Sequence, residues 1–407
     1  MNLRLPLRWN TELVIAILFL LPQVNYFLAN IMDMNGLSTI TPFLFVVAYS
    51  LGIMSYWRTL RTSKGILYMF TFVVLMIASI LLNDQVINYM IDENFVKSNV
   101  ITFFFLNFPL FLLLLIMRDF NLLMKYLLKG SLLVLCLAIT LFLFLLLIKS
   151  SKPVDYMSFA YMMLSPIIIC FVEGWRKNKK LLIWPIVSSF ILFVIGCRGA
   201  LVTLLVFLML CFCKYYLFNK ISMKYLVIKI FFLVGAFLIV FNMGTLLRQL
   251  SDILVQVGFS SRTLEFMLLG NDVFIQSEGR NMIWNQAIEN VGILGKGLFG
   301  DRTVLLDEYL NPIYPHNFIL EILVDFGMIL GPVLLVIFAV VVGKALLVSL
   351  KSGDSQQIQM AFAMISVFLV RHMVSASFLT SLDFWFYIGL TLNWITYCNY
   401  YDGYKTK

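Results

Sequence analysis

Long runs of apolar residues alternate along the chain with short connectors that carry Lys and Arg. A helix needs roughly 20 residues to cross a hydrocarbon core of about 30 Å, and each run is close to that length. The runs are continuously apolar rather than alternating in polarity, so they predict membrane-spanning helices and not a β-barrel. Twelve ranges meet this description: 12–31, 37–57, 66–82, 99–117, 126–148, 154–172, 181–197, 199–217, 225–243, 328–348, 358–378 and 382–400.

One long stretch, residues 244–316, interrupts the pattern. It contains five Lys or Arg, eight Asp or Glu and eight Gly. The chain is therefore predicted to have a membrane domain of nine spans over 1–243, a large loop over 244–316, and a second membrane domain of three spans over 317–407. Because the two membrane domains have the pattern of a scaffold, we expect any chemistry to lie in or beside the loop.

Lys and Arg are distributed unevenly between the two sides of this topology. Twenty of the 30 lie at the two termini and in or near alternate connectors, five lie in the large loop, and five lie in or nearest to the other short connectors. Because cytoplasmic connectors collect positive charge, both termini are predicted to be cytoplasmic and the loop to face outward. The formal net charge of +9 then reflects an inner face beside anionic lipid, so no nucleic-acid partner is expected.

Composition leads to the same class of protein. Apolar residues make up 61% of the chain and charged residues 13%, a balance that excludes a water-soluble domain of this length. The six Cys lie in or at the ends of predicted spans, and their spacing indicates neither a disulfide framework nor a metal site. The predicted fold class is an all-α polytopic membrane protein, with about 12 transmembrane helices and one large outward-facing loop between spans 9 and 10.

Arg198 occupies an unusual position, because Gly196-Cys197-Arg198-Gly199-Ala200 joins two apolar runs with no real loop. A tight outer turn would hold the guanidinium at or just below the membrane surface, where an unpaired charge costs up to about 2.5–3.5 kcal/mol. Arg198 should therefore have an anionic partner. That partner is either an acidic side chain or carbonyl of the protein, or a phosphate of a ligand.

The large loop divides at its glycines. Residues 245–269 mix apolar and polar positions in the manner of helices that lie on a membrane surface. Residues 280–291 have the period of an amphipathic helix that Arg280 opens, and glycines at 295, 297 and 300 then predict an irregular turn. The turn matches the letters G-x-G-x-x-G, but we reject a dinucleotide site because no strand precedes it and no βαβ unit surrounds it.

His316 follows Pro312 and Pro315 and precedes a helical pattern. In that predicted helix Asn317, Glu321 and Asp325 fall on one face at i, i+4 and i+8. Considered alone, His316 is either a structural loop residue or a base, since an imidazole with a pKa of about 6.5 can take a proton from a hydroxyl near neutral pH.

Arg198, Arg280 and His316 each lie at the end of a predicted span or helix on the outer side, so all three could meet in one outward cavity. Two guanidinium groups suit a diphosphate, because each can bind a pair of oxygens. An imidazole suits deprotonation of a sugar hydroxyl. No Asp-x-Asp occurs in the chain, which argues against a metal-bound nucleotide sugar. The three residues together indicate glycosyl transfer from a lipid diphosphate.

The chain resembles the O-antigen ligase and O-antigen polymerase superfamily of bacterial inner-membrane proteins. The resemblance covers nearly the whole length and is carried by the spans, the late outward loop and three short motifs in order. These motifs are Cys-Arg-Gly-Ala at 197–200, Gly279-Arg280 followed by Trp284, Gly295 and Gly297, and Pro315-His316-Asn317 with Leu320 and Gly327. The resemblance implies that Arg198 and Arg280 bind undecaprenyl diphosphate, that His316 activates the acceptor, and that the transfer is inverting and needs no metal or other cofactor.

The leading hypothesis is therefore a polysaccharide polymerase that transfers a growing glycan from undecaprenyl diphosphate to a hydroxyl of a new lipid-linked repeat unit. The nearest alternative is a ligase that passes the glycan to a lipid A core sugar, and a third is a flippase or other transporter of lipid-linked oligosaccharide. Expected partners are the lipid-linked oligosaccharides, membrane lipid, a chain-length regulator and a flippase. The expected location is the bacterial inner membrane.

Three further residues complete the candidate site as substrate contacts: Arg371, Glu321 and Asn317. Glu321 is a candidate to orient the His316 ring. Arg371 and its neighbour His372 lie about 20 Å along a predicted span, so the guanidinium must face the bundle interior. Arg371 is expected either to pair with Asp383 or to bind lipid phosphate.

Overall fold

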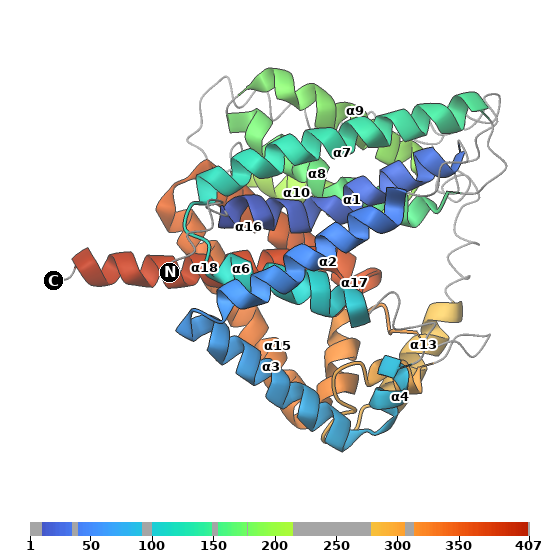
Figure 1. Ribbon diagram of the computed structural model, residues 1–407, viewed down its shortest axis with the longest axis vertical. Helices are drawn as coiled ribbons and strands as arrows, with labels where there is room; N and C mark the ends of the chain where they lie inside the picture. Colours follow the sequence, from blue (N-terminus) through green and yellow to red (C-terminus); the bar gives the residue numbers. More distant parts are fainter. Residues whose placement is uncertain are drawn as a thin grey trace, which may run out of the picture.

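The computed structural model describes residues 10–34, 40–91, 100–148, 154–176, 178–214, 278–305 and 313–405, and within these ranges every regular element is helical (Figure 1). The predicted ninth span, 225–243, lies outside the described residues. So do residues 244–277 and 306–312 of the predicted loop, including the segment expected on the membrane surface.

Helices cover each predicted span that falls within the described residues, with ends that shift by several residues. The N-terminal half contains α1 (Thr11–Met34), α2 (Ile40–Thr59), α3 (Ser63–Leu82), α4 (Gln85–Ile91), the π-helical turn η2 (Phe103–Asn107), α6 (Phe108–Leu115), α7 (Phe120–Ile148), α8 (Tyr156–Arg176), the 3-10 turn η3 (Lys179–Leu182), α9 (Ile183–Ile195) and α10 (Arg198–Phe212).

The C-terminal half contains the helix predicted to open at Arg280 and the helix predicted after His316. Its elements are α13 (Glu278–Glu289), α14 (Asp301–Val304), α15 (Phe318–Ser352), α16 (Ser355–Ser366), the π-helical turn η6 (Val367–Arg371), α17 (His372–Val374) and α18 (Leu382–Lys405).

Five of the described helices are long and apolar enough to cross a membrane: α1, α3, α7, α8 and α15. Shorter apolar helices cover Phe103–Leu115 and Gly199–Phe212. The protein is thus a helical chain with several candidate membrane spans, and the total of twelve spans stays a prediction from the sequence. In α3 and α15 only 17% and 11% of the apolar window is buried, as expected for helices whose sides face lipid.

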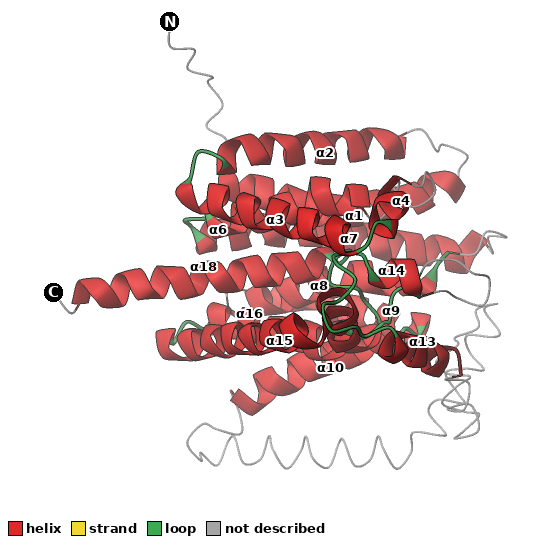
Figure 2. Ribbon diagram, turned by 90° about the horizontal axis from the view of Figure 1, so that it is seen from below, coloured by secondary structure: helices red, strands yellow, loops and turns green. Residues whose placement is uncertain are grey.

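The helices pack side by side as a bundle. The helix α1 contacts both α2 and α7, α7 contacts α8, and α8 contacts α9. Figure 2 shows α2 along one edge of the bundle and α10 along the opposite edge. Farther along the chain α18 packs between α6 and α15. Helices far apart in sequence are therefore neighbours, and the last span is held against the first half of the chain.

The beginning of α1 and the end of α18 lie toward the same end of the bundle (Figure 1). Near the start of α1, the Glu12 carboxylate accepts hydrogen bonds from the backbone N–H groups of Arg118 and Asp119. In α18, the Asn393 amide donates to the carbonyl of Met117, 2.9 Å away. Both contacts converge on the connector before α7, so α1 and α18 are tied to the same short segment of the chain.

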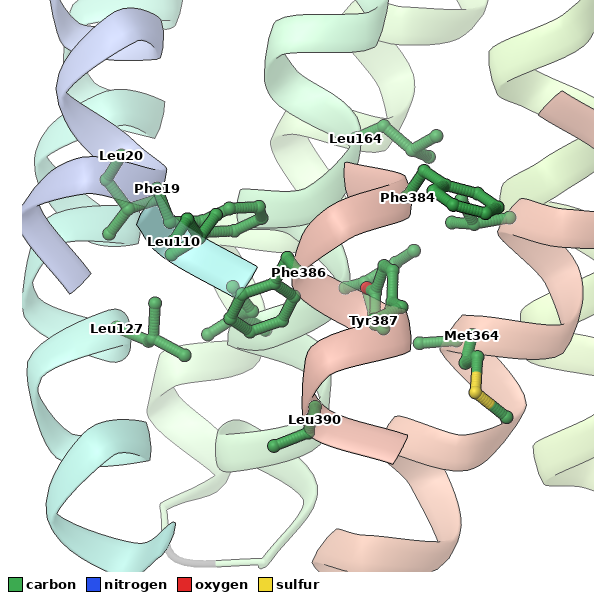
Figure 3. Packing of buried hydrophobic residues seen from close by; sticks show 14 of the residues in the cluster. Phe19, Leu20, Leu110, Leu127, Leu164, Met364, Phe384, Phe386, Tyr387 and Leu390 are labelled. Atoms are coloured by element: carbon green, nitrogen blue, oxygen red, sulfur yellow. The ribbon is translucent and has the colours of Figure 1, made fainter. Parts of the chain in front are cut away.

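The core between these helices is apolar and tightly packed (Figure 3). Phe19 of α1 stacks on Phe386 of α18 with ring centroids 4.1 Å apart. Leu110 of α6 and Leu390 of α18 are fully or almost fully buried in the same cluster. Because these side chains come from α1, α6 and α18, the core fixes the position of α18 against the first half of the chain.

Candidate functional site around Ser375

The turn that carries Arg198 is as tight as the sequence predicts. The helix α9 ends at Ile195, Gly196 takes the left-handed conformation with φ 84°, and α10 begins at Arg198. The buried Cys197 precedes the helix as its N-cap residue. The structure describes the backbone of Arg198 but not its side chain, so only the position of this residue at the first turn of α10 is defined.

The start of α10 lies against Tyr161 and Ser375. A Cβ atom built on Gly199 would meet the Tyr161 hydroxyl and would lie 4.0 Å from the Cβ of Ser375. The Tyr161 hydroxyl is also within hydrogen-bonding reach of the side chains of Ser375 and Cys197. Glycine at position 199 thus permits the backbone beside Arg198 to approach the Tyr161 hydroxyl closely, with Ser375 at ordinary contact distance.

His316 contacts the same residue, Ser375. Its Nδ1 lies 3.4 Å from the Ser375 carbonyl oxygen, and the Tyr314 hydroxyl donates to that oxygen at 2.9 Å. A carbonyl can only accept, so this contact places the imidazole proton on Nδ1 and makes Nε2 the basic nitrogen. His316 has φ 52°, a left-handed value that is uncommon for residues other than glycine and occurs often at functional sites.

The helix of Arg280 is attached to the His316 loop by Trp284. The Trp284 Nε1 donates to the carbonyl of Pro315 at 2.9 Å. Arg280 precedes Trp284 by four residues in α13, so both lie on the same face of that helix. The side chain of Arg280 is not among the described ones, but its backbone is one helical turn from the residue that holds Pro315.

Arg371 reaches the site from the π-helical turn η6. Its guanidinium pairs with Asp383, which confirms the ion pair that the sequence suggested, and Asp383 also accepts from the Ser165 hydroxyl at 2.7 Å. The Arg371 guanidinium carbon lies 4.6 Å from the centre of the Tyr161 ring. The backbone N–H of Ser375 donates to the Arg371 carbonyl at 2.9 Å, so the meeting point of the site is one turn from Arg371.

The side chains of Asn317 and Glu321 have structural roles in and beside α15. The Asn317 side chain caps α15, accepting from the N–H groups of Ile319 and Leu320. Glu321 is fully buried, and its two oxygens accept from the Ser377 hydroxyl and from the N–H of Phe378. These contacts give no support to Glu321 as the group that orients His316, because both oxygens are occupied by Ser377 and Phe378.

Glu321 belongs instead to a buried ion cluster that the sequence did not predict. We call Asp301, Arg302, Glu321, Asp325 and Ser377 the Arg302 cluster. Arg302 is 2% exposed, pairs with Asp301 and lies 3.5 Å from a Glu321 oxygen. It donates to Ser377 at 2.7 Å, and Asp325 accepts from the backbone N–H of Asp301 at 2.9 Å.

Burial and charge oppose each other in this cluster. Burial raises the pKa of the Asp301 carboxyl, while the Arg302 guanidinium acts to lower it. Burial also acts to lower the pKa of Arg302, but the charges of Asp301 and Glu321 outweigh it and the pKa is raised, so Arg302 stays charged. The sequence signal for the cluster was the acidic stripe Glu321 and Asp325 on an otherwise apolar helix, since buried carboxylates need a cationic partner.

The Arg302 cluster packs against the loop that carries His316. The Arg302 guanidinium carbon lies 5.1 Å from the centre of the Tyr314 ring, and the Tyr314 and His316 rings are 4.1 Å apart. Ser377, which Arg302 and Glu321 both contact, is two residues from Ser375. Both sides of the His316–Ser375 contact are therefore held by one buried cation.

The glycines of the G-x-G-x-x-G pattern belong to a turn that binds the backbone of α15 where that helix is interrupted. Gly327 has φ 73° and interrupts that helix. Residues 292–300, here called the glycine turn, supply the missing backbone partners at distances from 2.8 to 3.4 Å. The four bonds run from Lys296 N to Val324 O, Gly297 N to Asp325 O, Met328 N to Gly292 O, and Ile329 N to Ile293 O.

Side chains at these glycines would prevent the glycine turn from packing against α15 and α3. A Cβ on Gly295 would collide with the backbone at Asp325 and Gly327, and a Cβ on Gly297 would lie 2.6 Å from atoms of Ser79. The glycine turn is also fixed to α3, because the Leu298 N–H donates to the Ser79 hydroxyl at 2.8 Å. The motif thus joins α3 to the broken helix that begins directly after His316 and Asn317.

Taken together, the described residues bring His316, Arg371 and the backbone of Arg198 around Ser375 and Tyr161, with the helix of Arg280 attached at Pro315. The arrangement offers an imidazole and a half-buried guanidinium that both lie near Ser375, and two further backbone positions that carry arginine. Searches for a matching family model, a similar characterised protein and a similar solved structure found no match to this chain.

Proposed function

We propose that the protein is an oligosaccharide repeat-unit polymerase of the O-antigen, capsule or exopolysaccharide type. It transfers a growing glycan from undecaprenyl diphosphate to a hydroxyl of a new lipid-linked repeat unit at the outer face of the bacterial inner membrane. The proposal combines the motif resemblance with the chemistry that the residues around Ser375 can perform.

The observation that carries the proposal is the convergence on Ser375. Residues 198, 316 and 371 belong to three separate segments of the chain. Gly199, next to Arg198, lies near Ser375, and the His316 ring contacts the Ser375 carbonyl. Arg371 is one helical turn before Ser375 and accepts a hydrogen bond from its backbone N–H. The backbone of Arg198, the Arg371 carbonyl and a half-buried imidazole thus lie around one residue, although they come from different parts of the chain. A substrate with a diphosphate next to a reacting sugar carbon would give this convergence a function.

The transfer needs a base and cations that hold the leaving group. In the proposed step the acceptor hydroxyl oxygen attacks the anomeric carbon of the donor glycan, and its proton passes to Nε2 of His316. The bond from that carbon to the diphosphate oxygen breaks, and the electron pair leaves with the lipid diphosphate. Arg198 and Arg280 stabilise the developing charge, and Arg371 contributes a further positive charge from the Tyr161 side.

Single substitutions His316→Ala, Arg280→Ala and Arg198→Ala test the proposal. Each variant is expected to lose long glycan chains on gels of surface polysaccharide, while its amount in the membrane equals that of wild type. Arg61→Ala, at an exposed inner connector, is the matched control and should leave chain length unchanged. Normal chain length in all three correctly inserted variants would refute the proposal.

A deletion strain separates the polymerase from the ligase of the same superfamily. Loss of a polymerase leaves a single repeat unit attached to the lipid A core. Loss of a ligase leaves undecorated core, with finished glycan still attached to undecaprenyl diphosphate. Undecorated core with stranded glycan would mean that the acceptor is the lipid A core, whereas the proposed donor and base would stay the same.

The broken helix α15 does not by itself favour a transporter. Discontinuous helices in transporters often leave backbone groups that bind the substrate or ion. Here the glycine turn supplies partners to Val324, Asp325, Met328 and Ile329, so the break serves the attachment of the loop to the membrane domain.

A further inference from the structure

An apolar groove runs along α3, apart from the residues around Ser375. Its volume is about 560 Å³, and it lies between α3, α2 and the segment that contains η2 and α6. Along α3 the lining begins at Met69 and ends at Ile80, a length of about 16 Å at 1.5 Å per residue. The groove is therefore long and narrow rather than compact.

The lining offers nothing to a polar ligand. Apart from Tyr56, all of its side chains are hydrocarbon or thioether, and the Tyr56 hydroxyl donates to the backbone carbonyl of Phe104. Val73 and Ile77 on the α3 wall are 48% and 53% exposed, on a helix that is apolar enough to span a membrane. A groove with this lining on a lipid-facing helix suits a hydrocarbon chain.

The outer end of the groove joins the scaffold of the candidate site. Ile80 follows Ser79, whose hydroxyl accepts from Leu298 of the glycine turn. On the opposite wall Phe104 follows Phe103, which packs edge-on against Phe299 of the same turn at 5.9 Å. The glycine turn in turn is bonded to α15, which begins directly after His316 and Asn317.

The wall opposite α3 includes the π-helical turn η2, where Phe104 and Phe105 line the groove. Such turns are rare inside helices and occur frequently at functional sites. An ordinary annular lipid needs no such local change of helix, because any smooth apolar face accommodates it. The π-turn thus adds a second reason to expect a particular occupant.

We infer that this groove holds the polyprenyl tail of the lipid diphosphate substrate. The identity of this lipid rests on the proposed function. A tail gains no hydrophobic free energy by leaving a bilayer, so the groove acts by packing and by orientation of the tail. It would align the lipid along α3 so that the diphosphate emerges beside the glycine turn.

Photolabelling tests the inference without any glycan transfer. The probe is a polyprenyl diphosphate with a diazirine on its isoprenoid chain, added to the full chain in phosphatidylethanolamine and phosphatidylglycerol vesicles. We expect labelling of peptides that cover 69–80 and 100–108, and competition by unlabelled polyprenyl diphosphate but not by excess phospholipid. Equal labelling by a diazirine phospholipid, without that competition, would mean annular lipid only and would overturn the inference.

Two adjacent valines give a matched pair of variants. Val73 lines the groove and Val74 does not, although they are 48% and 47% exposed on the same helix. Val73→Trp should reduce labelling of the groove by the polyprenyl probe several-fold, whereas Val74→Trp should leave it unchanged. Equal labelling of the two variants would contradict the inference, and both must show wild-type membrane levels.

The two proposals fail in different ways. One outcome keeps the groove and rejects the polymerase: Val73→Trp removes the competed labelling, but the His316→Ala, Arg280→Ala and Arg198→Ala variants all still make long glycan chains. Long chains that depend on His316, together with labelling that Val73→Trp does not change, would keep the polymerase and reject the groove.

Discussion

Trp284 donates a hydrogen bond from its indole nitrogen to the carbonyl of Pro315, 2.9 Å away, and so ties the helix of Arg280 to the residue before His316. The two partners are 31 residues apart, and part of the chain between them lies outside the described residues. One side chain thereby couples the position of a candidate cation to that of the candidate base.

The first prediction concerns this bond. Trp284→Phe keeps an aromatic ring but removes the donor, and a typical hydrogen bond contributes about 1 kcal/mol. We expect the rate of glycan polymerisation by the purified protein to fall about fivefold, because the Arg280 helix and the His316 loop are no longer held together. Trp57→Phe, at a position that is 70% exposed, is the control. An unchanged rate would show that the bond does not position the site.

A second prediction separates stability from activity at Arg371. Asp383→Leu leaves the guanidinium buried without its partner, which costs about 3–5 kcal/mol, and should lower the Tm in detergent. The double variant Arg371→Met with Asp383→Leu removes both charges and should recover most of the Tm. Its polymerase activity should stay low, because the proposed substrate contact is gone. Full activity in the stable double variant would exclude Arg371 from the site.

A third prediction compares two glycines of α15. Gly327 has φ 73° and its missing side chain leaves room for Gly295 and Ile293, so Gly327→Ala introduces backbone strain of about 1–3 kcal/mol in addition to a collision. Gly343 lies in open space on the same helix. Gly343→Ala should be neutral or stabilise by about 0.5–1 kcal/mol.

The Tm in detergent and the rate of proteolysis in the glycine turn measure the difference between these two variants. Gly327→Ala should expose the turn to protease, because the four backbone bonds that hold it depend on the break. Similar Tm values and similar cleavage for both variants would mean that the interruption of α15 at Gly327 is not needed to hold the glycine turn in place.

A fourth prediction follows from the buried carboxyl of Asp301. Burial raises its pKa in the folded protein above the value of about 4 in an unfolded chain. The folded state then binds this proton more tightly, so its contribution to stability is complete below about pH 4 and is lost as the pH rises through the folded pKa. The Asp301 carboxyl is surrounded by Arg302, Glu321 and Asp325, whose charges influence the pH at which it titrates.

Asp301→Asn cannot titrate and should therefore show a Tm that falls less steeply with rising pH than the wild-type Tm. Melting in detergent from pH 4 to pH 8 measures the two slopes. Parallel slopes would indicate that the Asp301 carboxyl does not change its protonation on unfolding.

The sequence by itself determined the local features of this protein. The apolar runs predicted helices at the positions where the described part of the chain has them. Gly196 predicted a tight turn before Arg198, and the helical period after His316 placed the start of α15. These predictions succeeded because each depends on residues within about one or two helical turns, where periodicity, capping and glycine act directly.

Only the tertiary structure decided which of these features meet. His316 and Ser375 are 59 residues apart, and no local pattern marks Ser375 as the residue on which the site converges. Glu321 was expected beside His316, but packing turned it to Arg302, whose burial could not be inferred from a charge in a polar loop. The glycine motif likewise acquired its role from Gly327 and Ser79 on other helices. The physical reason is that burial and long-range backbone bonds are properties of the packed bundle, and a sequence specifies them only through the fold as a whole.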